Sequence, residues 1–271
     1  MVKVIAWNIQ QRADAWRSLV GSDADVALLQ EAKEPPPDVA ARVKVNPGPW
    51  RTGASRPWRA AIVNLSACAN VEWLDAKPLA AAQEGELAVS RPGTLAAATI
   101  TPLSGESFIA VSVYAPWENP HSMIKCDFSY ADASVHRLIS DLSVFASKRF
   151  HQNILIAGDL NVLYGYGEYG DAYWAGRYET IFSRMSALGL RFVGPQAPDG
   201  RRAEPWPEEL PRESNNVPTY YASRQTPETC TRQLDFVFAS ERLAGRVRVR
   251  ALNAPDQWGP SDHCRVEIEV A

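Results

Sequence analysis

The sequence lacks any apolar run of about 18 residues, the length that a helix needs to cross a lipid bilayer. Its first eight residues become polar too early to form the apolar centre of a signal peptide. We therefore expect no transmembrane segment and no cleaved leader in this chain.

The sequence also lacks paired cysteines. Its four cysteines lie far apart and form no CxxC motif: Cys68, Cys126, Cys230 and Cys264. This spacing is unlike that of a zinc site or a disulfide framework. Free thiols are typical of a reducing compartment, so we expect a cytoplasmic protein.

An excess of positive charge is absent as well. The chain has 28 Lys and Arg against 31 Asp and Glu, a net charge of −3, and its pI is about 5.9. These values exclude a strongly basic protein that holds nucleic acid mainly by releasing counterions. They leave room for an enzyme that meets phosphate through a local basic patch and a divalent metal ion.

The composition is that of a globular protein, with 46% apolar and 22% charged residues over 271 positions. We find no internal repeat and no domain boundary, so we expect one domain over residues 1–271. Six prolines lie between Pro195 and Pro218. Because strands resume after this stretch, it is expected to be a long surface loop.

Alternating and continuous apolar patterns predict many strands and few helices. The expected strands cover residues 2–7, 25–31, 60–64, 94–101, 107–114, 153–159, 234–238 and 264–270. The expected helices cover residues 14–19, a short stretch from 38, 135–145 and 178–188. This order favours two packed sheets with helices outside them over a simple series of βαβ units.

Polar side chains follow or end several of these strands, where sites are commonly built on a rigid scaffold. They are Asn8, Glu31, Tyr114, Asp159, Asn161, Asp235, Asp262 and His263. Taken singly, such residues are more often helix caps or turn residues. Asp235 is more informative, because a carboxylate inside an apolar strand needs a partner, although a structural ion pair would also explain it.

Taken together and in order, these residues resemble the endonuclease/exonuclease/phosphatase superfamily. The matching segments are Trp7-Asn8, Leu29-Gln30-Glu31, Val113-Tyr114-Ala115-Pro116, Gly158-Asp159-Leu160-Asn161, Gln233-Leu234-Asp235-Phe236 and Ser261-Asp262-His263. They extend over nearly the whole chain, and the Gly-Asp-x-Asn and Ser-Asp-His motifs are the specific ones. Tyr114 stands where the deoxyribonuclease and sphingomyelinase branches usually have His. The pattern is therefore most similar to the exonuclease III and abasic-site endonuclease branch.

The resemblance implies an α/β fold, a four-layer α/β/β/α sandwich in which two packed mixed β-sheets are flanked by helices. It also implies cleavage of phosphate esters with Mg²⁺ or Mn²⁺. Within that family pattern, Glu31 is the expected metal ligand, with Asn8 beside it and Asp262 as a second or supporting ligand.

The resemblance also assigns roles to the remaining residues of the set. Asp159 would position or deprotonate the attacking water, and Asn161 would donate to a non-bridging oxygen. His263 would activate or orient the reacting groups, and Asp235 would hold its imidazole. Tyr114 would donate a hydrogen bond to the phosphate or assist the leaving oxygen.

A few further residues are weaker candidates for substrate contact: Arg12, Arg177, Arg232, Trp117 and Trp258. For the arginines, an ordinary solvated charge is the favoured explanation, because surface Arg is common. For the tryptophans, burial in the core or the anchoring of a loop does so, whereas an aromatic over a metal site could stack on a base or a sugar.

Three functions remain open at this point. The first is a metal-dependent phosphodiester hydrolase, a nuclease acting on DNA or RNA, which the ordered set with Tyr114 favours. The second is a phosphatase or phosphodiesterase acting on a small phosphate ester or a lipid head group, which the acidic net charge favours. The third is a binding module that keeps the scaffold without catalysis, and the completeness of the set speaks against it.

Overall fold

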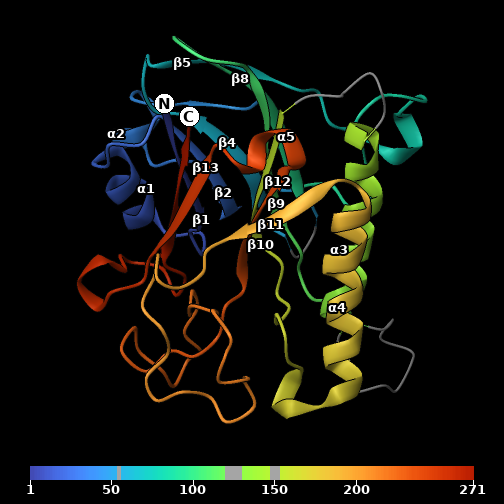
Figure 1. The fold of residues 1–271 in the computed structure, drawn as a ribbon. Helices are drawn as coiled ribbons and strands as arrows, with labels where there is room; N and C mark the ends of the chain where they lie inside the picture. The colour runs from blue at the N-terminus through green and yellow to red at the C-terminus, as the bar shows by residue number, and fades with distance from the viewer. Residues whose placement is uncertain (54–55, 120–129, 147–152) are drawn as a thin grey trace.

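The computed structural model describes residues 1–53, 56–119, 130–146 and 153–271. Its chain forms two six-stranded sheets that face each other, with helices on the outer sides (Figure 1). This arrangement confirms the predicted four-layer sandwich. Cys126 lies outside the described residues, whereas Cys68, Cys230 and Cys264 are free thiols. Among the described residues, no helix is both long and apolar enough to span a bilayer.

The first sheet has the strand order β13-β14-β1-β2-β4-β3. Its strands are β1 (Val2–Asn8), β2 (Val26–Ala32), β3 (Lys44–Val45), β4 (Arg59–Asn64), β13 (Val247–Leu252) and β14 (Arg265–Val270). β1 pairs in parallel with β2 and antiparallel with β14. The sheet is therefore mixed.

The second sheet has the order β11-β12-β10-β9-β8-β5 and is also mixed, because β10 is parallel to β9 and antiparallel to β12. Its strands are β5 (Ala69–Trp73), β8 (Leu95–Pro102), β9 (Phe108–Tyr114), β10 (Asn153–Asp159), β11 (Leu190–Gly194) and β12 (Asp235–Ser240). A separate small ribbon pairs β6 (Lys77–Pro78) with β7 (Ala88–Val89).

The α-helices are α1 (Ala13–Val20), α2 (Pro37–Ala40), α3 (Ala131–Leu142), α4 (Ala172–Ala187) and α5 (Glu241–Ala244). Short 3₁₀ turns are η1 (Leu79–Ala81), η2 (Ser143–Ala146), η4 (Glu168–Gly170) and η5 (Pro255–Gln257). Helices α1 and α2 cover the first sheet, and α3 and α4 lie together along the second (Figure 1).

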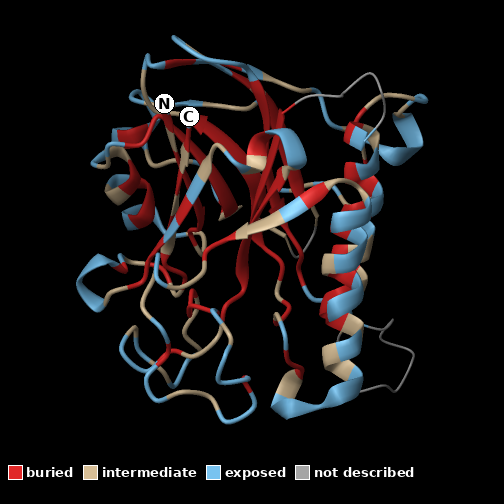
Figure 2. Ribbon diagram, in the orientation of Figure 1, coloured by how far each residue is buried: buried red, intermediate tan, exposed pale blue. Residues whose placement is uncertain are grey.

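The alternation of side chains along each strand explains the layers. On β1, Val4 and Ala6 point into the core between the sheets, whereas Ile5 and Trp7 pack outward in the cluster that includes Trp16 of α1. The central strands of both sheets are consequently buried on both faces (Figure 2). This double burial is why their sequences read as nearly continuous apolar runs.

The strands that the sequence prediction missed include β5, β11 and β13. β13 is an edge strand whose exposed Arg248 and Arg250 interrupt the apolar pattern. β5 and β11 are also edge strands, each five residues long. Edge strands pair on one side alone, and their apolar signal is correspondingly weak.

Two helix boundaries also differ from the prediction. α4 begins at Ala172 rather than near 178, because the Asp171 side chain accepts a hydrogen bond from the backbone N–H of Tyr173 at 2.7 Å and caps the helix. α3 begins at Ala131, and the predicted helix through Phe145 continues past Leu142 as the 3₁₀ turn η2. Residues 195–218 form no helix or strand, and all of them are described.

Gly158 permits the close pairing of β9 and β10 just before the strand ends. A Cβ atom at this position would lie 1.9 Å from the backbone carbonyl oxygen of Val113, and the φ angle of +156° disfavours other residues. We predict that Gly158→Ala lowers the free energy of unfolding by about 3 kcal/mol, because two backbones must separate.

Chemical denaturation measures this change, and Gly176→Ala in α4 is the matched control. No described atom lies within 4 Å of the Cβ position at Gly176, and Ala favours a helix, so that variant should gain about 0.5–1 kcal/mol. An unchanged denaturation midpoint for Gly158→Ala would contradict the described β9–β10 register.

Candidate active site

The strand ends of the two sheets bring the polar residues together at one end of the sandwich. In the second sheet, Asp159 is paired with Tyr114 of β9 on one side and with Asp235 of β12 on the other. In the first sheet, Asn8 at the end of β1 is paired with Gln30 of β2. The two sheets therefore present their polar ends to each other.

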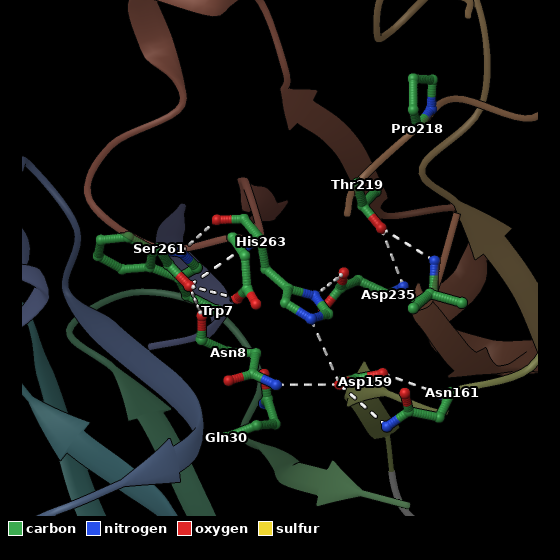
Figure 3. A network of polar contacts seen from close by, with 12 residues as sticks. Trp7, Asn8, Gln30, Asp159, Asn161, Pro218, Thr219, Asp235, Ser261 and His263 are labelled. Carbon is green, nitrogen blue, oxygen red and sulfur yellow. Dashed lines mark hydrogen bonds and ion pairs between the residues drawn. The ribbon is translucent and has the colours of Figure 1, made fainter. Parts of the chain in front are cut away.

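Hydrogen bonds join these ends across the space between the sheets. Asn8 Nδ2 donates to Asp159 Oδ2 at 2.9 Å, and the Tyr114 hydroxyl donates to Glu31 Oε1 at 2.6 Å (Asp159 and Asn8 are shown in Figure 3). Deeper in the core, Gln30 Nε2 donates to the Ser112 hydroxyl at 3.0 Å. Each sheet thus positions residues of the other.

Asp235, His263 and Asp159 form an array in this network, with His263 in the middle (Figure 3). His263 Nδ1 lies 2.8 Å from Asp235 Oδ2, and Nε2 lies 3.7 Å from Asp159 Oδ2. His263 is 4% exposed, and its imidazole lies between two buried carboxyl groups. This is the geometry by which a carboxylate fixes a histidine in one orientation.

The electrostatics of the array favour a charged histidine. Burial by itself lowers the pKa of His263, but the carboxylates of Asp235 and Asp159 outweigh it and raise that pKa to about 10. Burial also raises the pKa of Asp159, opposed by His263 and increased further by Asp235, to about 7. A carboxyl group with this pKa can exchange a proton near neutral pH.

Backbone and hydroxyl contacts fix Asp235 and His263 in place. The Thr219 hydroxyl accepts from the backbone N–H groups of Leu234 and Asp235 at 3.0 and 3.1 Å. The Ser261 hydroxyl donates to the carbonyl oxygen of Asn8 at 2.6 Å and accepts from the His263 backbone N–H. The first pair of bonds holds Asp235 at the start of β12. The second pair holds the Ser-Asp-His motif beside Asn8 at the end of β1.

Asn161 holds Asp159 in the described arrangement. Its backbone N–H donates to Asp159 Oδ1 at 2.9 Å, and its side-chain amide lies 3.3 Å from Asp159 Oδ2 and 3.2 Å from the carbonyl oxygen of Ala115. Its φ of +52° is unusual for a residue other than glycine. Tight local bonding therefore sustains a strained backbone at this point.

Tyr114 stays protonated and is a hydrogen-bond donor. Burial raises the pKa of its hydroxyl well above the usual value, and the carboxylates of Glu31 and Asp159 raise it further. Its ring meets Trp58 edge to face, with centroids 4.8 Å apart. The hydroxyl is accordingly fixed on Glu31, which itself has a strained φ of +48°.

The carboxylates fit a divalent cation. The described lining of the cleft has four acidic residues, Glu31, Asp159, Glu168 and Asp262, but only two basic ones, Arg232 and His263. Burial raises the pKa of Asp262, and the carboxylate of Glu31 adds to this rise. The repulsion between these carboxylates would be relieved by a cation bound between them.

The donor set suits Mg²⁺ or Mn²⁺ better than a fully protein-ligated metal. Within the described ranges, no three or more His, Cys, Asp or Glu side chains are grouped so that they could hold an ion. Mg²⁺ commonly binds through one or two carboxylates and keeps several waters. Glu31 and Asp262 can play this part, and the Asn8 side-chain oxygen, which accepts from the Gln10 backbone N–H at 3.0 Å, keeps a second lone pair for the same ion.

The cleft has a volume of about 230 Å³. A larger cavity of about 530 Å³ lies by β4, β5 and β8, but among the described residues that line it there is only one carboxylate, Asp75, and one guanidinium, Arg59. The smaller cleft contains Asp159, Asn161 and His263 together. The candidate active site is therefore the smaller cleft.

The weaker candidates divide into two groups. Arg232 and Trp117 line the cleft, where Arg232 donates to Glu168 at 2.8 Å and the Trp117 indole lies 3.3 Å from Asn161 Oδ1. Arg12 lies at the edge, since it donates to Gln10, whose own amide donates to Asp262 at 2.7 Å. Arg177 lies outside the cleft lining, on α4, and is bonded to Asp132.

The expectation that Trp258 stacks on substrate is wrong. This residue is 1% exposed, and its indole N–H donates to the Ser261 carbonyl oxygen at 3.0 Å. It packs with Val217, Cys230, Ala251 and Cys264 in a small apolar cluster. Trp258 supports the Ser-Asp-His turn from behind and cannot reach the cleft.

Sequence reasoning assigned no role to several residues of the site, although Gln30, Thr219 and Tyr220 lie in segments that match the family pattern. Gln30, Ser112 and Thr219 are buried polar side chains that carry the internal hydrogen bonds described above. Tyr220 and Glu168 line the cleft, and the Tyr220 ring lies 4.9 Å from that of His263. Gln30 directly precedes Glu31, and a polar residue inside an apolar strand was the signal available for it.

The comparisons with known proteins agree with this geometry. The family described as "Endonuclease/Exonuclease/phosphatase family" matches residues 5–263. The chain belongs to this family. It is thereby a hydrolase that acts on phosphate esters. No curated protein matches the chain significantly in sequence.

Solved structures of the same fold match this chain along nearly its whole length. An AP endonuclease from Archaeoglobus fulgidus is 18% identical, with a TM-score of 0.63 over 100% of this chain and 99% of that one. The AP endonuclease LMAP from Leishmania major is 17% identical, with a TM-score of 0.63 over 99% and 87%.

A third similar structure is the 3′ phosphatase NExo from Neisseria, bound to a product DNA hairpin. It is 17% identical, with a TM-score of 0.58 over 100% of both chains. Identities this low establish a common fold.

The contrast between the two tryptophans gives a test of the site's construction. We predict that Trp258→Ala lowers the free energy of unfolding by about 3–5 kcal/mol, because it leaves a cavity in a packed cluster. Trp117→Ala should change it by under about 1 kcal/mol, since the side chain is 41% exposed. Denaturation midpoints measure both, and equal losses would refute this assignment.

Proposed function

We propose that this protein is a Mg²⁺-dependent phosphodiesterase that cleaves nucleic acid. The observation that carries the proposal is the placement of Asp159 between Asn8 and His263, in a cleft that also holds the carboxylates of Glu31 and Asp262. The nucleic-acid substrate is supported by the named activities of the similar structures, two AP endonucleases and a phosphatase bound to DNA.

The buried array suits attack by water on a phosphate. Asp159 accepts the proton of the water, because burial and the neighbouring Asp235 carboxylate raise its pKa and so make it a stronger base. His263, charged, held by Asp235 and lining the cleft, would stabilise the negative charge that develops on the phosphoryl oxygens. As the water oxygen bonds to phosphorus, the P–O bond to the leaving oxygen breaks, and that oxygen takes a proton from solvent. Asn161 keeps Asp159 aimed into the cleft.

Glu31 and Asp262 would hold the metal ion, and the Tyr114 hydroxyl would orient Glu31. A divalent cation bound there supplies a Lewis acid for the phosphoryl oxygen. Arg232, on the same cleft, is placed to meet a phosphate oxygen once its bond to Glu168 is exchanged.

A small phosphate ester is the second candidate substrate. Its support is the acidic balance of the cleft and a volume of about 230 Å³. Phosphate release from mononucleotides or phosphoinositides, without cleavage of DNA or RNA, would favour it.

We predict that the protein hydrolyses at least one of four substrates: single-stranded DNA, duplex DNA, abasic DNA or RNA. EDTA should abolish that hydrolysis, and Mg²⁺ or Mn²⁺ should restore it. Glu31→Gln should lower kcat/KM by more than about a hundredfold, because it removes a charged ligand. Glu72→Gln, an exposed carboxylate on β5, is the matched control and should leave the rate unchanged. Full activity in EDTA would overturn the metal dependence.

We also predict that Asp235→Asn lowers kcat by about 10²–10⁴-fold with little change in KM, because His263 loses the carboxylate that orients and charges it. Steady-state kinetics separate the two parameters. Asp256→Asn, at an exposed turn, is the control. A kcat within about twofold of the native value would mean that Asp235 is only a structural partner of His263.

A further inference from the structure

The exposed aromatic side chains gather beside the cleft. Among the described residues, the large exposed hydrophobic side chains include three aromatic ones, Trp117, Tyr169 and Tyr173, which are 41%, 91% and 64% exposed. Trp117 lines the cleft, and Tyr169 follows Glu168, which also lines it. Tyr173 lies in the first turn of α4, which contacts the turn η4 that contains Glu168. Such grouping is not expected of scattered surface residues.

A continuous line of contacts leads from the cleft to α4. Trp117 lines the cleft, and the next residue, Glu118, is joined to Tyr130 by two backbone hydrogen bonds of 3.1 and 2.8 Å. The Arg177 guanidinium of α4 lies 5.6 Å from the centre of the Tyr130 ring and 5.6 Å from that of Tyr173. These contacts therefore connect the cleft to the first turns of α4.

Arg177 is anchored in a way that holds Tyr173 in place. Its Nε donates at 2.7 Å to Asp132, a carboxylate that is 1% exposed, and its Nη1 donates at 2.9 Å to the Tyr173 hydroxyl. A solvent-exposed side chain normally keeps its rotamer freedom. Here the buried carboxylate of Asp132 fixes the Arg177 guanidinium, and that guanidinium fixes the exposed ring of Tyr173.

Tyr169 is held outward by a strained backbone. Its φ is +53° in the turn η4, which is uncommon for a residue other than glycine. The preceding residue, Glu168, lines the cleft and is bonded to Arg232 at 2.8 Å. Gly167 packs tightly on the start of α4, since a Cβ there would lie 2.0 Å from the Asp171 carbonyl oxygen. Strain of this kind persists where the surroundings enforce it.

We propose that Trp117, Tyr130, Tyr169, Tyr173 and Arg177, here called the aromatic rim, bind the unpaired bases of a single strand whose phosphate lies in the cleft. This inference rests on the proposed function and narrows its substrate to single-stranded nucleic acid. Aromatic rings stack on the face of any base, and an arginine among them attracts the backbone. A duplex offers no free base faces to such a surface, because its bases are already stacked.

The test measures binding separately from cleavage. Fluorescence anisotropy follows a labelled single strand about 12 nucleotides long, as DNA and as RNA, in Mg²⁺. An Asp159→Asn background prevents cleavage during the measurement. The variants are Tyr169→Ala and Tyr173→Ala, with Tyr169→Phe retaining the ring. Leu103→Ala is the matched control, because Leu103 is 82% exposed in the turn between β8 and β9.

Each Tyr→Ala change should weaken single-strand binding about five- to hundredfold, while Tyr169→Phe and Leu103→Ala stay within about twofold. Blunt duplex binding should be little affected. In the Asp159-containing protein, KM for the single strand should rise with kcat unchanged, and hydrolysis of bis(4-nitrophenyl) phosphate, which has no base, should not change.

Single-strand binding within about twofold of the native value in both Tyr→Ala variants would overturn the aromatic rim. Equal weakening of duplex and single strand would overturn it too. Absence of metal-dependent cleavage with tyrosine-dependent binding intact would reject the proposed function and keep the rim.

Discussion

The hydrogen bond from Asn8 to Asp159 joins the ends of two different sheets, and the rest of the site depends on that junction. It forms only where β1 and β10 stop at the same level of the sandwich. The same junction places His263, which comes just before β14, against Asp159 and Asp235 of the other sheet. A slip of β1 against its paired strands by a single residue would turn the Asn8 side chain to the opposite face of the sheet.

Charge is the second constraint on this end of the molecule. Asp159 and Asp235 are buried, and burying a carboxylate is costly unless it is paired and hydrogen-bonded. His263 pairs with both, while Glu31 and Asp262 remain as negative charge facing the cleft. The cleft therefore carries an excess of negative charge. A bound divalent cation would neutralise this charge, and the same cation would bind a substrate phosphate.

Local patterns in the sequence predicted two packed sheets with helices outside, and the resemblance to the family added the four-layer order and the candidate site residues. Apolar strands that end in Asn8, Glu31, Tyr114 and Asp159 are visible without coordinates. The sequence could not separate Trp117 from Trp258, since both adjoin site motifs, and only packing makes one partly exposed and the other buried. Tyr169 and Tyr173 carried no signal because exposure, φ and the Asp132–Arg177 anchor are properties of the folded chain.

The most direct test of the central claim is a crystal structure with Mn²⁺ and a nucleotide product. The account predicts anomalous density for one cation about 2.0–2.2 Å from a carboxylate oxygen of Glu31 or Asp262. It also predicts a phosphate oxygen within hydrogen-bonding distance of His263 Nε2. A cation bound away from both carboxylates, or a phosphate seated outside the cleft that contains Asp159, would contradict it.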